Sequence, residues 1–375
     1  MKKAVCISCT HHYQERIAYG ENALRKAGYN CTYITSDFHH TSKKRHQVDL
    51  PHCIQLPTVG YTKNLSFRRL YSHMRFAKDA MKAVADLKPD LLYVEVPPNS
   101  LCKEAAKYKK RNPNVKLVFD IFDMWPESFP SNKLKKLLKI PFGIWAKFRN
   151  KGLPAADLVF TECDLFQEAL QPHLKGVESR TLHLCKPAAT TEICKPLPQQ
   201  ETIHLCYLGS INNIIDIPAI SALIGQVQAL RPVVLHIIGD GETRDTLIES
   251  VEATGATVQF HGSVYDNGEK QAIFDMCSFG LNIMKDSVFI GLTMKSVDYF
   301  AGGLPIINSI GGDTRSLVET RQIGINLNRE NPGETAKKIA GIDTETHLQM
   351  RNNTLSCFRD LLSEEVFSKN LISAI

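Results

Sequence analysis

The chain has 375 residues, 43% hydrophobic and 22% charged, which predicts a soluble globular protein of two domains rather than one core. No apolar run approaches the ~20 residues that a membrane-spanning helix needs, which argues against an integral membrane protein of that kind. Residues 1–195 carry a net charge of +14 and residues 196–375 a net charge of −8. The basic half favours an anionic partner such as a membrane surface or a lipid-linked phosphate.

The first half alternates short apolar runs with amphipathic stretches. The apolar run that follows Met1 stops at Ser8 and Thr10, too early for a signal peptide, so we interpret it as a buried strand. Continuous apolar runs at 91–96 and 117–122 are typical of parallel strands buried on both faces. The pattern predicts a doubly wound parallel sheet, with strands at 3–9, 31–35, 91–96, 117–122 and 157–161 and helices at 15–26, 67–87 and 165–170.

Residues 131–152 combine seven Lys and Arg residues with apolar and aromatic ones, such as Leu137, Ile144 and Trp145, and contain no acid. Pro141 predicts that this stretch divides into two short segments. Basic groups beside apolar ones suit the interfacial layer of an anionic membrane, so we expect a peripheral contact with the inner face of the cell membrane. A solvated helix face packed on the core would give the same pattern. Nucleic acid is disfavoured, because no recognised binding motif accompanies the charge.

The second half repeats the alternation more regularly. The proline-rich stretch 186–200 predicts a linker between a first domain at 1–185 and a second at 201–355. A final helix, within 356–375, is expected to pack back toward the first domain. Within the second domain we expect strands at 204–208, 233–238, 258–261, 280–284 and 305–308. Its helices are expected at 218–230, 244–254, 270–277, 294–301 and 314–320. The fold class is therefore α/β, with two Rossmann-like doubly wound domains.

The eleven cysteines are odd in number and scattered through the predicted strands and helices. This distribution favours reduced thiols in a cytoplasmic protein over a disulfide framework. Cys6 and Cys9 form a Cys-x-x-Cys pair, but no second pair completes a zinc site. We therefore expect buried thiols here, and neither a metal nor a cofactor.

Small and polar residues follow the strands of the second half, where open α/β sheets bind ligands. A glycine lets the backbone approach a phosphate closely, and a hydroxyl adds a hydrogen-bond donor. A glycine in such a place is also ordinary turn chemistry. The candidates for donor contacts are Gly209 and Ser210 after the first strand, Gly239 and Gly241 after the second, and Gly262, Ser263 and Val264 after the third.

The helix predicted at 294–301 opens on further candidates. Thr293, Lys295 and Ser296 place hydroxyls and a cation at the positive end of its dipole. Asp298 lies three residues after Lys295, spaced to accept hydrogen bonds from a ribose diol while Lys295 holds a phosphate. The alternative is that both are solvated residues of a surface helix.

Several segments resemble a known family. The segments Tyr207-Leu-Gly-Ser, Ile237-Ile-Gly-Asp-Gly-Glu, Phe260-His-Gly-Ser-Val and Met294-Lys-Ser-Val-Asp-Tyr-Phe-Ala-Gly-Gly-Leu-Pro resemble the donor domain of family 4 retaining glycosyltransferases of GT-B fold. Asp123-Met-Trp-Pro-Glu-Ser resembles a segment of bacterial members that build surface polysaccharides. The resemblance covers most of residues 115–325.

The resemblance implies a nucleoside-diphosphate sugar bound in a cleft between the domains without a metal. We favour UDP over GDP as its nucleotide. Backbone groups of 262–264 would read the base and Asp298 would bind the ribose. Thr293 and Lys295 would lie near the diphosphate, with Gly209 and Ser210 on its other side.

The chain departs from the family pattern at three places. Ile290 stands where the first acid of the Glu-x7-Glu motif belongs, and the nearby Asp286 has the wrong spacing. The Arg and Lys that usually follow Gly209 are absent, as is the glycine pair of the first N-terminal loop. A cation from the basic half would have to compensate.

In the first half, Asp123 ends a predicted strand and could orient the acceptor hydroxyl or act as a base. A turn-capping role before Trp125 explains it equally. Glu127, His11 and His12 are further candidates for the acceptor side. The catalytic assignment rests on Asp123 and Lys295.

The sequence thus predicts a glycosyltransferase of the hexosyltransferase type that uses a lipid-linked or glycan acceptor in cell-surface polysaccharide biosynthesis. A nucleotide-sugar epimerase is one alternative, although it needs more cleft carboxylates than the chain offers. A non-catalytic subunit that binds a nucleotide sugar or a partner transferase is the other.

Overall fold

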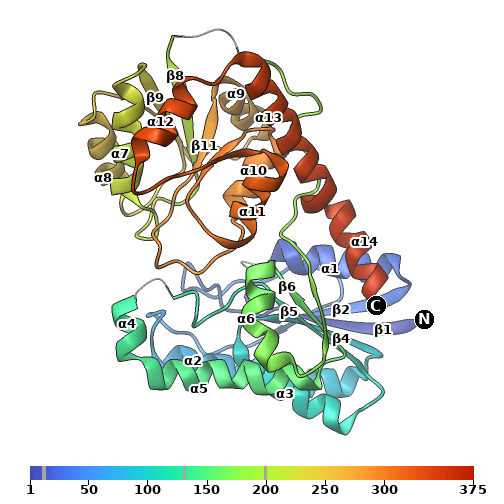
Figure 1. The fold of residues 1–375 in the computed structure, drawn as a ribbon. Coiled ribbons are helices and arrows are strands. Elements are labelled where there is room, and N and C mark those ends of the chain that lie inside the picture. Colours follow the sequence, from blue (N-terminus) through green and yellow to red (C-terminus); the bar gives the residue numbers. More distant parts are fainter. Residues whose placement is uncertain (11–13, 130–131, 198–200) are drawn as a thin grey trace. The chain divides into compact units, whose positions relative to one another are not determined.

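The computed structural model describes residues 1–10, 14–129, 132–197 and 201–375. The chain forms two compact units (Figure 1). The N-terminal unit consists of Met1–His183 and Phe367–Ile375, and the C-terminal unit of Leu184–Val366. His11 and His12 lie outside the described residues.

The N-terminal unit is built on a seven-stranded parallel sheet of order β3-β2-β1-β4-β5-β6-β7. This order reverses direction between β1 and β4, as in doubly wound sheets. The strands are β1 (Lys2–Ile7), β2 (Tyr29–Ser36), β3 (Cys53–Leu56), β4 (Leu91–Val96), β5 (Lys116–Ile121), β6 (Leu158–Thr161) and β7 (Glu178–Thr181).

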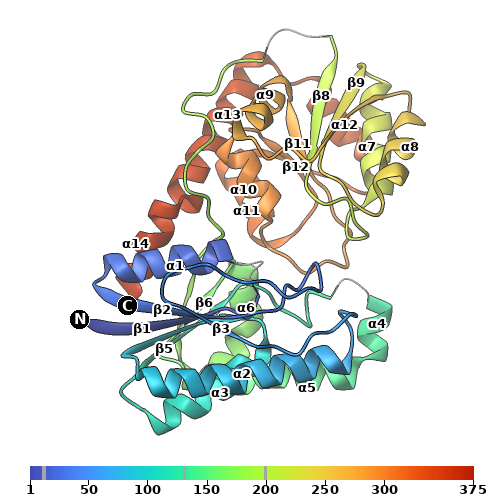
Figure 2. The same cartoon turned by 180° about the vertical axis from the view of Figure 1, so that it is seen from behind.

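Helices cover both faces of this sheet. Three of them lie side by side along one face (Figure 2): α2 (Phe67–Leu87), α3 (Asn99–Arg111) and α5 (Lys139–Gly152), with α6 (Asp164–Leu174) next to α5. The other face carries α1 (Gln14–Lys26) and the end of α14 (Glu364–Ala374). The last helix therefore does pack on the first unit, as expected from the sequence.

Two sequence expectations need correction. Pro141 does not divide the basic stretch, because it lies in the first turn of α5, where proline removes no intrahelical hydrogen bond. The division comes earlier, between α4 (Asn132–Leu137) and α5. The final helix is also not continuous: a π-helical turn at Phe358–Leu362 ends at Ser363, and α14 begins after it.

The C-terminal unit has a six-stranded parallel sheet of order β10-β9-β8-β11-β12-β13. Its strands are β8 (Ile203–Leu208), β9 (Val233–Ile238), β10 (Thr257–Gly262), β11 (Phe279–Asn282), β12 (Ile306–Asn308) and β13 (Gly324–Asn326). Its helices are α7 (Ile217–Gln228), α8 (Arg244–Glu252), α9 (Asn267–Met276), α10 (Met294–Ala301), α11 (Gly312–Arg321), α12 (Pro332–Ala340) and α13 (Thr344–Cys357).

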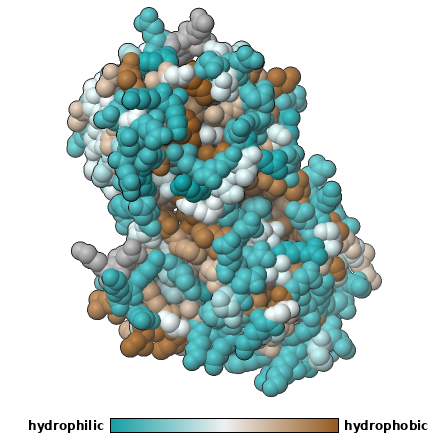
Figure 3. Space-filling model, viewed as in Figure 1, coloured by the Kyte–Doolittle hydropathy of each residue, from teal (hydrophilic) through white to brown (hydrophobic). Residues whose placement is uncertain are grey.

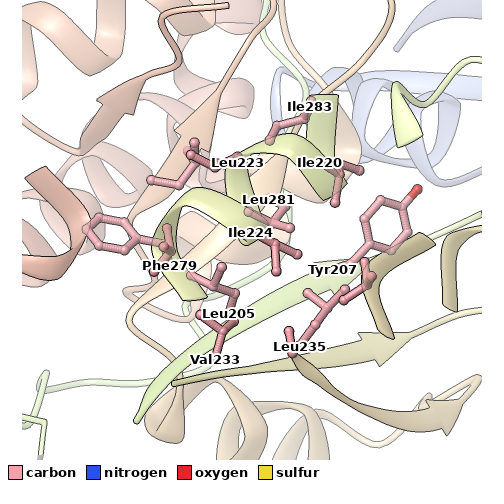
Figure 4. Packing of buried hydrophobic residues seen from close by; sticks show 14 of the residues in the cluster. Leu205, Tyr207, Ile220, Leu223, Ile224, Val233, Leu235, Phe279, Leu281 and Ile283 are labelled. Carbon is pink, nitrogen blue, oxygen red and sulfur yellow. The ribbon is translucent and has the colours of Figure 1, made fainter. Parts of the chain in front are cut away.

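A hydrophobic core of this unit lies between the sheet and α7, and α8 and α12 contribute to it. Ile220, Leu223 and Ile224 recur at helical spacing, so they share one face of α7 and are all buried. They pack on alternate residues of the strands, such as Leu205 and Leu235 (Figure 4). Each fully buried aliphatic side chain stabilises the fold by about 1.5–3 kcal/mol. This packing fixes the strand ends that carry the candidate site.

Candidate active site

The loops that follow β8, β9 and β10 meet at one edge of the C-terminal sheet. The Gly209 N–H donates to the Ile238 carbonyl at 2.8 Å, and the Gly239 N–H donates to the Gly262 carbonyl at 2.7 Å. The glycines predicted after three separate strands are therefore neighbours. Ser210 and Ser263 are exposed beside them, and Val264 is half-buried.

Two of these glycines are required by close backbone packing. Gly239 has a φ of 134°, and a Cβ there would lie 2.1 Å from the Gly209 carbonyl oxygen. A Cβ at Gly241 would lie 2.3 Å from the Ile211 carbonyl oxygen. The structure therefore explains both by the shape of the loops, and leaves their backbone as the surface offered to a ligand.

Lys295 extends over the ring of Tyr207. Its Nζ lies 4.3 Å from the ring centroid and 3.3 Å from the hydroxyl oxygen of Tyr207. Its Cε would lie 3.9 Å from a Cβ at Gly209, so the cation sits beside the loop after β8. Burial lowers the pKa of Lys295 to about 8, because desolvation disfavours the charged ammonium. An anion bound at this point would restore the charge.

The first turn of α10 is held by buried hydroxyls. The Thr293 Oγ1 accepts from the Ser296 N–H at 3.1 Å and donates to the Asn282 Oδ1 at 3.2 Å. The hydroxyl oxygens of Thr293 and Ser296 are 2.7 Å apart, and both side chains are buried. Both hydroxyls were predicted to face the donor; the Thr293 hydroxyl caps the helix, and the Ser296 hydroxyl bonds to it. The N–H groups of a first helical turn have no partner inside the helix and stay suited to an anion.

Asn282 belongs to a ladder that the sequence reasoning missed. Asn282, Asn308 and Asn326 end three adjacent strands in register. Their amides are linked at 3.0 and 2.9 Å. The ladder orients Asn282 toward Thr293. The signal in the sequence is the same residue type at the end of three successive strands.

Asp298 is paired with two lysines. Its Oδ1 lies 2.9 Å from the Nζ of Lys270 and 3.2 Å from the Nζ of Lys186. Lys295, expected to act beside Asp298, turns to Tyr207 instead. A ribose diol at Asp298 would therefore share the carboxylate with these two ammonium groups. Neither lysine was singled out from the sequence.

A lysine of the C-terminal unit, and not of the basic half as expected, contacts the loop that lacks the usual Arg and Lys. Lys285 donates from Nζ to the Asn213 carbonyl oxygen at 2.7 Å, and its own N–H donates to the Ile214 carbonyl. Asp286, considered as a substitute for the acid missing at Ile290, is paired with Arg329 at 3.0 Å. Lys285 was missed because it is far from Gly209 in sequence.

In the N-terminal unit, Asp123 and Glu127 have different surroundings. The Ser128 hydroxyl donates to the Asp123 Oδ1 at 2.6 Å, and burial raises the pKa of Asp123 while Ser128 and Arg69 oppose that rise. Glu127 accepts both guanidinium N–H groups of Arg149, at 3.1 and 2.7 Å. Asp123 is thus held by a hydroxyl group, whereas Glu127 is engaged in an ion pair with Arg149.

Three further findings on the described residues concern metal sites, membrane-spanning helices and cysteines. No group of three or more His, Cys, Asp or Glu side chains among them is placed to hold a metal ion. None of the described helices has both the length and the apolar character needed to cross a membrane. All eleven cysteines are free thiols.

Known proteins resemble this chain in part of its sequence and in its whole fold. Residues 202–343 match the family described as glycosyl transferases group 1. No curated protein matches the chain by sequence.

Among solved structures, a sucrose-phosphate synthase from Thermosynechococcus elongatus is similar with a TM-score of 0.71 at 15% identity, covering 99% of this chain and 97% of that one. The lipopolysaccharide outer core galactosyltransferase WaaB gives a TM-score of 0.68 at 16% identity, over 100% and 99%. HepE from Anabaena, in complex with UDP and glucose, gives 0.65 at 12% identity, also over 100% and 99%.

These similarities define the fold as GT-B, with two Rossmann-like domains. The family match over the C-terminal unit, together with this fold, supports a transferase enzyme with a group 1 glycosyltransferase domain.

Proposed function

We propose that the protein transfers a sugar, with retention at the anomeric carbon, from a nucleoside diphosphate to a lipid-linked or polysaccharide acceptor. The observation that carries this proposal is the position of Lys295 beside the Gly209 loop, at the start of α10. A partly desolvated cation, helix N–H groups and close-packed glycine backbone together suit a diphosphate. UDP is the favoured nucleotide, and the complex of HepE with UDP and glucose supports it.

The chemistry follows from these groups. As the bond between sugar and diphosphate breaks, negative charge grows on the diphosphate oxygens. Lys295 and the N–H groups of α10 stabilise that charge in a site of low dielectric constant. Lys285, close to the backbone after β8, supplies a second cation in place of the missing Arg and Lys. Asp298 holds the ribose.

The N-terminal unit would bind the acceptor. Asp123 lies directly after β5, at the edge where parallel sheets bind ligands. Its raised pKa suits a group that takes a proton from an acceptor hydroxyl. This role and the cell-surface pathway are part of the proposal.

The same unit would approach an anionic membrane through α4 and α5. Leu137, Ile140 and Ile144 are 78%, 77% and 54% exposed, and Lys136 and Lys139 are exposed among them. Apolar surface is visible at α4 and the start of α5 in Figure 3. Exposed apolar side chains among lysines suit the interface of an anionic bilayer.

Isothermal titration with UDP and GDP tests the donor assignment. We expect UDP to bind more tightly than GDP and Lys295→Gln to weaken UDP binding at least tenfold, because a charge-assisted contact contributes roughly 1.5–3 kcal/mol. Asp298→Ala should weaken the binding of UDP, which carries the ribose diol, more than the binding of pyrophosphate, which does not. Lys337→Gln, an exposed lysine of α12, is the matched control. Unchanged affinity in both site variants would overturn the proposal.

Two features also favour a donor-binding subunit without turnover. Ile290 provides no acid, and both lysines at Asp298 neutralise the remaining one. Release of UDP from UDP-sugars by the purified chain separates the two functions. Binding without any release, with or without acceptor lipids, would favour the subunit.

A further inference from the structure

Two cations of the N-terminal unit converge on one aromatic ring. The Nζ of Lys43 lies 4.9 Å from the centroid of Tyr61, and the guanidinium carbon of Arg69 lies 6.0 Å from it. Both side chains also donate to Asn64, Lys43 to the side-chain oxygen and Arg69 to the backbone carbonyl. Over the part of the chain that the structure describes, neither forms an ion pair with a carboxylate. Two cations are thus gathered here without an ion pair, and Arg69 also acts electrostatically on the carboxyl of Asp123, whose pKa it lowers.

Burial and the charge of Arg69 shift the pKa values of two neighbouring side chains. The pKa of His73 is lowered well below its usual value by burial and then by the charge of Arg69. The pKa of Lys43 is lowered by burial and then by Arg69 as well. The Arg69 Nε is buried and has no hydrogen-bond partner among the residues that the structure describes. Such an arrangement is unfavourable for the protein alone and becomes favourable when an anion binds.

The position of the cluster also points to a ligand. Lys43 follows β2, Tyr61 follows β3, and Arg69 lies in the first turn of α2, whose N-cap is Ser66. All therefore lie at the edge where parallel strands end and where a helix dipole favours anions. Asp123, the proposed base, follows β5 at the same edge.

Aromatic walls complete the site. The guanidinium of Arg69 lies 5.4 Å from the ring centroid of Trp125, so it is flanked by Trp125 and Tyr61. Stacking leaves those guanidinium N–H groups of Arg69 that do not donate to Asn64 to bind a phosphate. The ring of Trp145 lies 5.8 Å from that of Trp125. Aromatic rings beside a phosphate site also suit the apolar face of a sugar or a lipid chain.

We propose that Lys43 and Arg69, with Tyr61 and Trp125, form a subsite for the phosphate or diphosphate group of the acceptor. This rests on the proposed transferase function and specifies its acceptor: a lipid phosphate or diphosphate that carries the sugar. The subsite would hold the anion while Asp123 meets the acceptor hydroxyl.

Tryptophan fluorescence tests the subsite directly, because both tryptophans of the chain belong to this cluster. Pyrophosphate is titrated into the full chain at constant ionic strength. We expect a saturable change in emission, and at least tenfold weaker binding in Arg69→Gln and in Lys43→Gln. Arg75→Gln is the matched control, since it removes the same charge from α2 at a position exposed and paired with Asp79. Circular dichroism verifies that each variant folds.

Further titrations separate the possible sources of the anion. Farnesyl diphosphate below its micellar concentration should bind more tightly than pyrophosphate and depend on Arg69. Vesicles of phosphatidylglycerol should not produce an Arg69-dependent change. The acceptor subsite is overturned if only the vesicles cause an Arg69-dependent change in emission. It is also overturned if Arg69→Gln and Arg75→Gln bind pyrophosphate with equal affinity.

The test of the acceptor subsite can be separated from the test of the donor site. Lys295→Gln should keep the pyrophosphate response of the tryptophans while losing UDP affinity. A chain that binds UDP but shows no response to pyrophosphate refutes the subsite alone. A chain that responds to pyrophosphate but not to UDP refutes the proposed donor instead.

Discussion

Lys295 carries a charge that ordinary buffers can remove. Its pKa is lowered to about 8 by burial, so the ammonium is present below pH 8 and is lost as the pH rises through that value. The diphosphate binds the charged form, and the ionisation of UDP hardly changes above pH 7 because a terminal phosphate has its second pKa near 6. We therefore expect UDP affinity to be steady from pH 6.5 to 7.5 and to fall roughly tenfold by pH 9.

Lys295→Arg is the control for this prediction, because arginine stays protonated throughout the range. Titration calorimetry should give a flat pH dependence for this variant, even if its absolute affinity differs. An equal decline in the wild type and in Lys295→Arg would assign the effect to another group.

At the scale of single residues, the sequence predicts which loops meet at the candidate donor site better than it predicts the side-chain contacts made there. The glycines at 209, 239 and 262 come together because strand ends in a parallel sheet share an edge. The contacts of Lys295 and Asp298 do not follow from their spacing on α10. They depend on Tyr207 and on two lysines from distant segments, which only the packed structure brings within reach.

At the scale of elements, the start of α10 depends on one side chain. Thr293→Val keeps the shape of the residue but removes the hydroxyl that accepts from Ser296 and donates to Asn282. Loss of an N-cap costs about 1 kcal/mol, and the buried Asn282 oxygen loses a donor as well. We expect urea unfolding to show a destabilisation of about 1–2 kcal/mol, with weaker UDP binding. Thr293→Ser should restore both, and equal defects in the two variants would contradict the capping role.

Some helices and strands could be predicted from the sequence and others could not. The helix at 67–87 and the strand at 91–96 are confirmed with the expected bounds, because long periodic or continuously apolar runs are strong signals. The strands β3 and β7 were missed. They lie at the sheet edges, have no fully buried residue and, as in Glu178–Thr181, no apolar run. Their strand state follows from pairing with neighbours, which the local sequence does not encode.

At the scale of the whole molecule, the exposed apolar residues of α4 and α5 predict membrane attachment. The triple variant Leu137→Ser, Ile140→Ser and Ile144→Ser should lower binding to phosphatidylglycerol vesicles at least tenfold in a flotation assay, because less apolar surface enters the interface. Addition of salt should weaken the remaining binding by screening the lysines. The matched control replaces Leu230, Tyr265 and Met276, exposed apolar residues of the other unit. An equal loss in the control would mean that the attachment is not specific to α4 and α5.

From Phe367 onward the last helix belongs to the N-terminal unit, although the chain reaches it only after the C-terminal unit. Phe367 is 2% exposed and lies 5.3 Å from the guanidinium of Arg16 and 6.1 Å from the ring of Tyr19, both on α1. Arg16 in turn binds the buried Asp120 through two hydrogen bonds, at 2.9 and 2.8 Å. Phe367 therefore covers an ion pair that fixes α1 to the sheet.

Phe367→Ala should accordingly destabilise a unit whose other residues end at His183. Removing a buried aromatic ring costs about 3–5 kcal/mol, and water admitted to the Arg16–Asp120 pair weakens it further. In hydrogen exchange we expect faster exchange in α1 and β5, while the strands of the C-terminal unit keep their protection. Ile372→Ala, a half-exposed position on the same helix, should change little. If β8 and β9 exchange faster in Phe367→Ala while α1 keeps its protection, α14 stabilises the C-terminal unit instead.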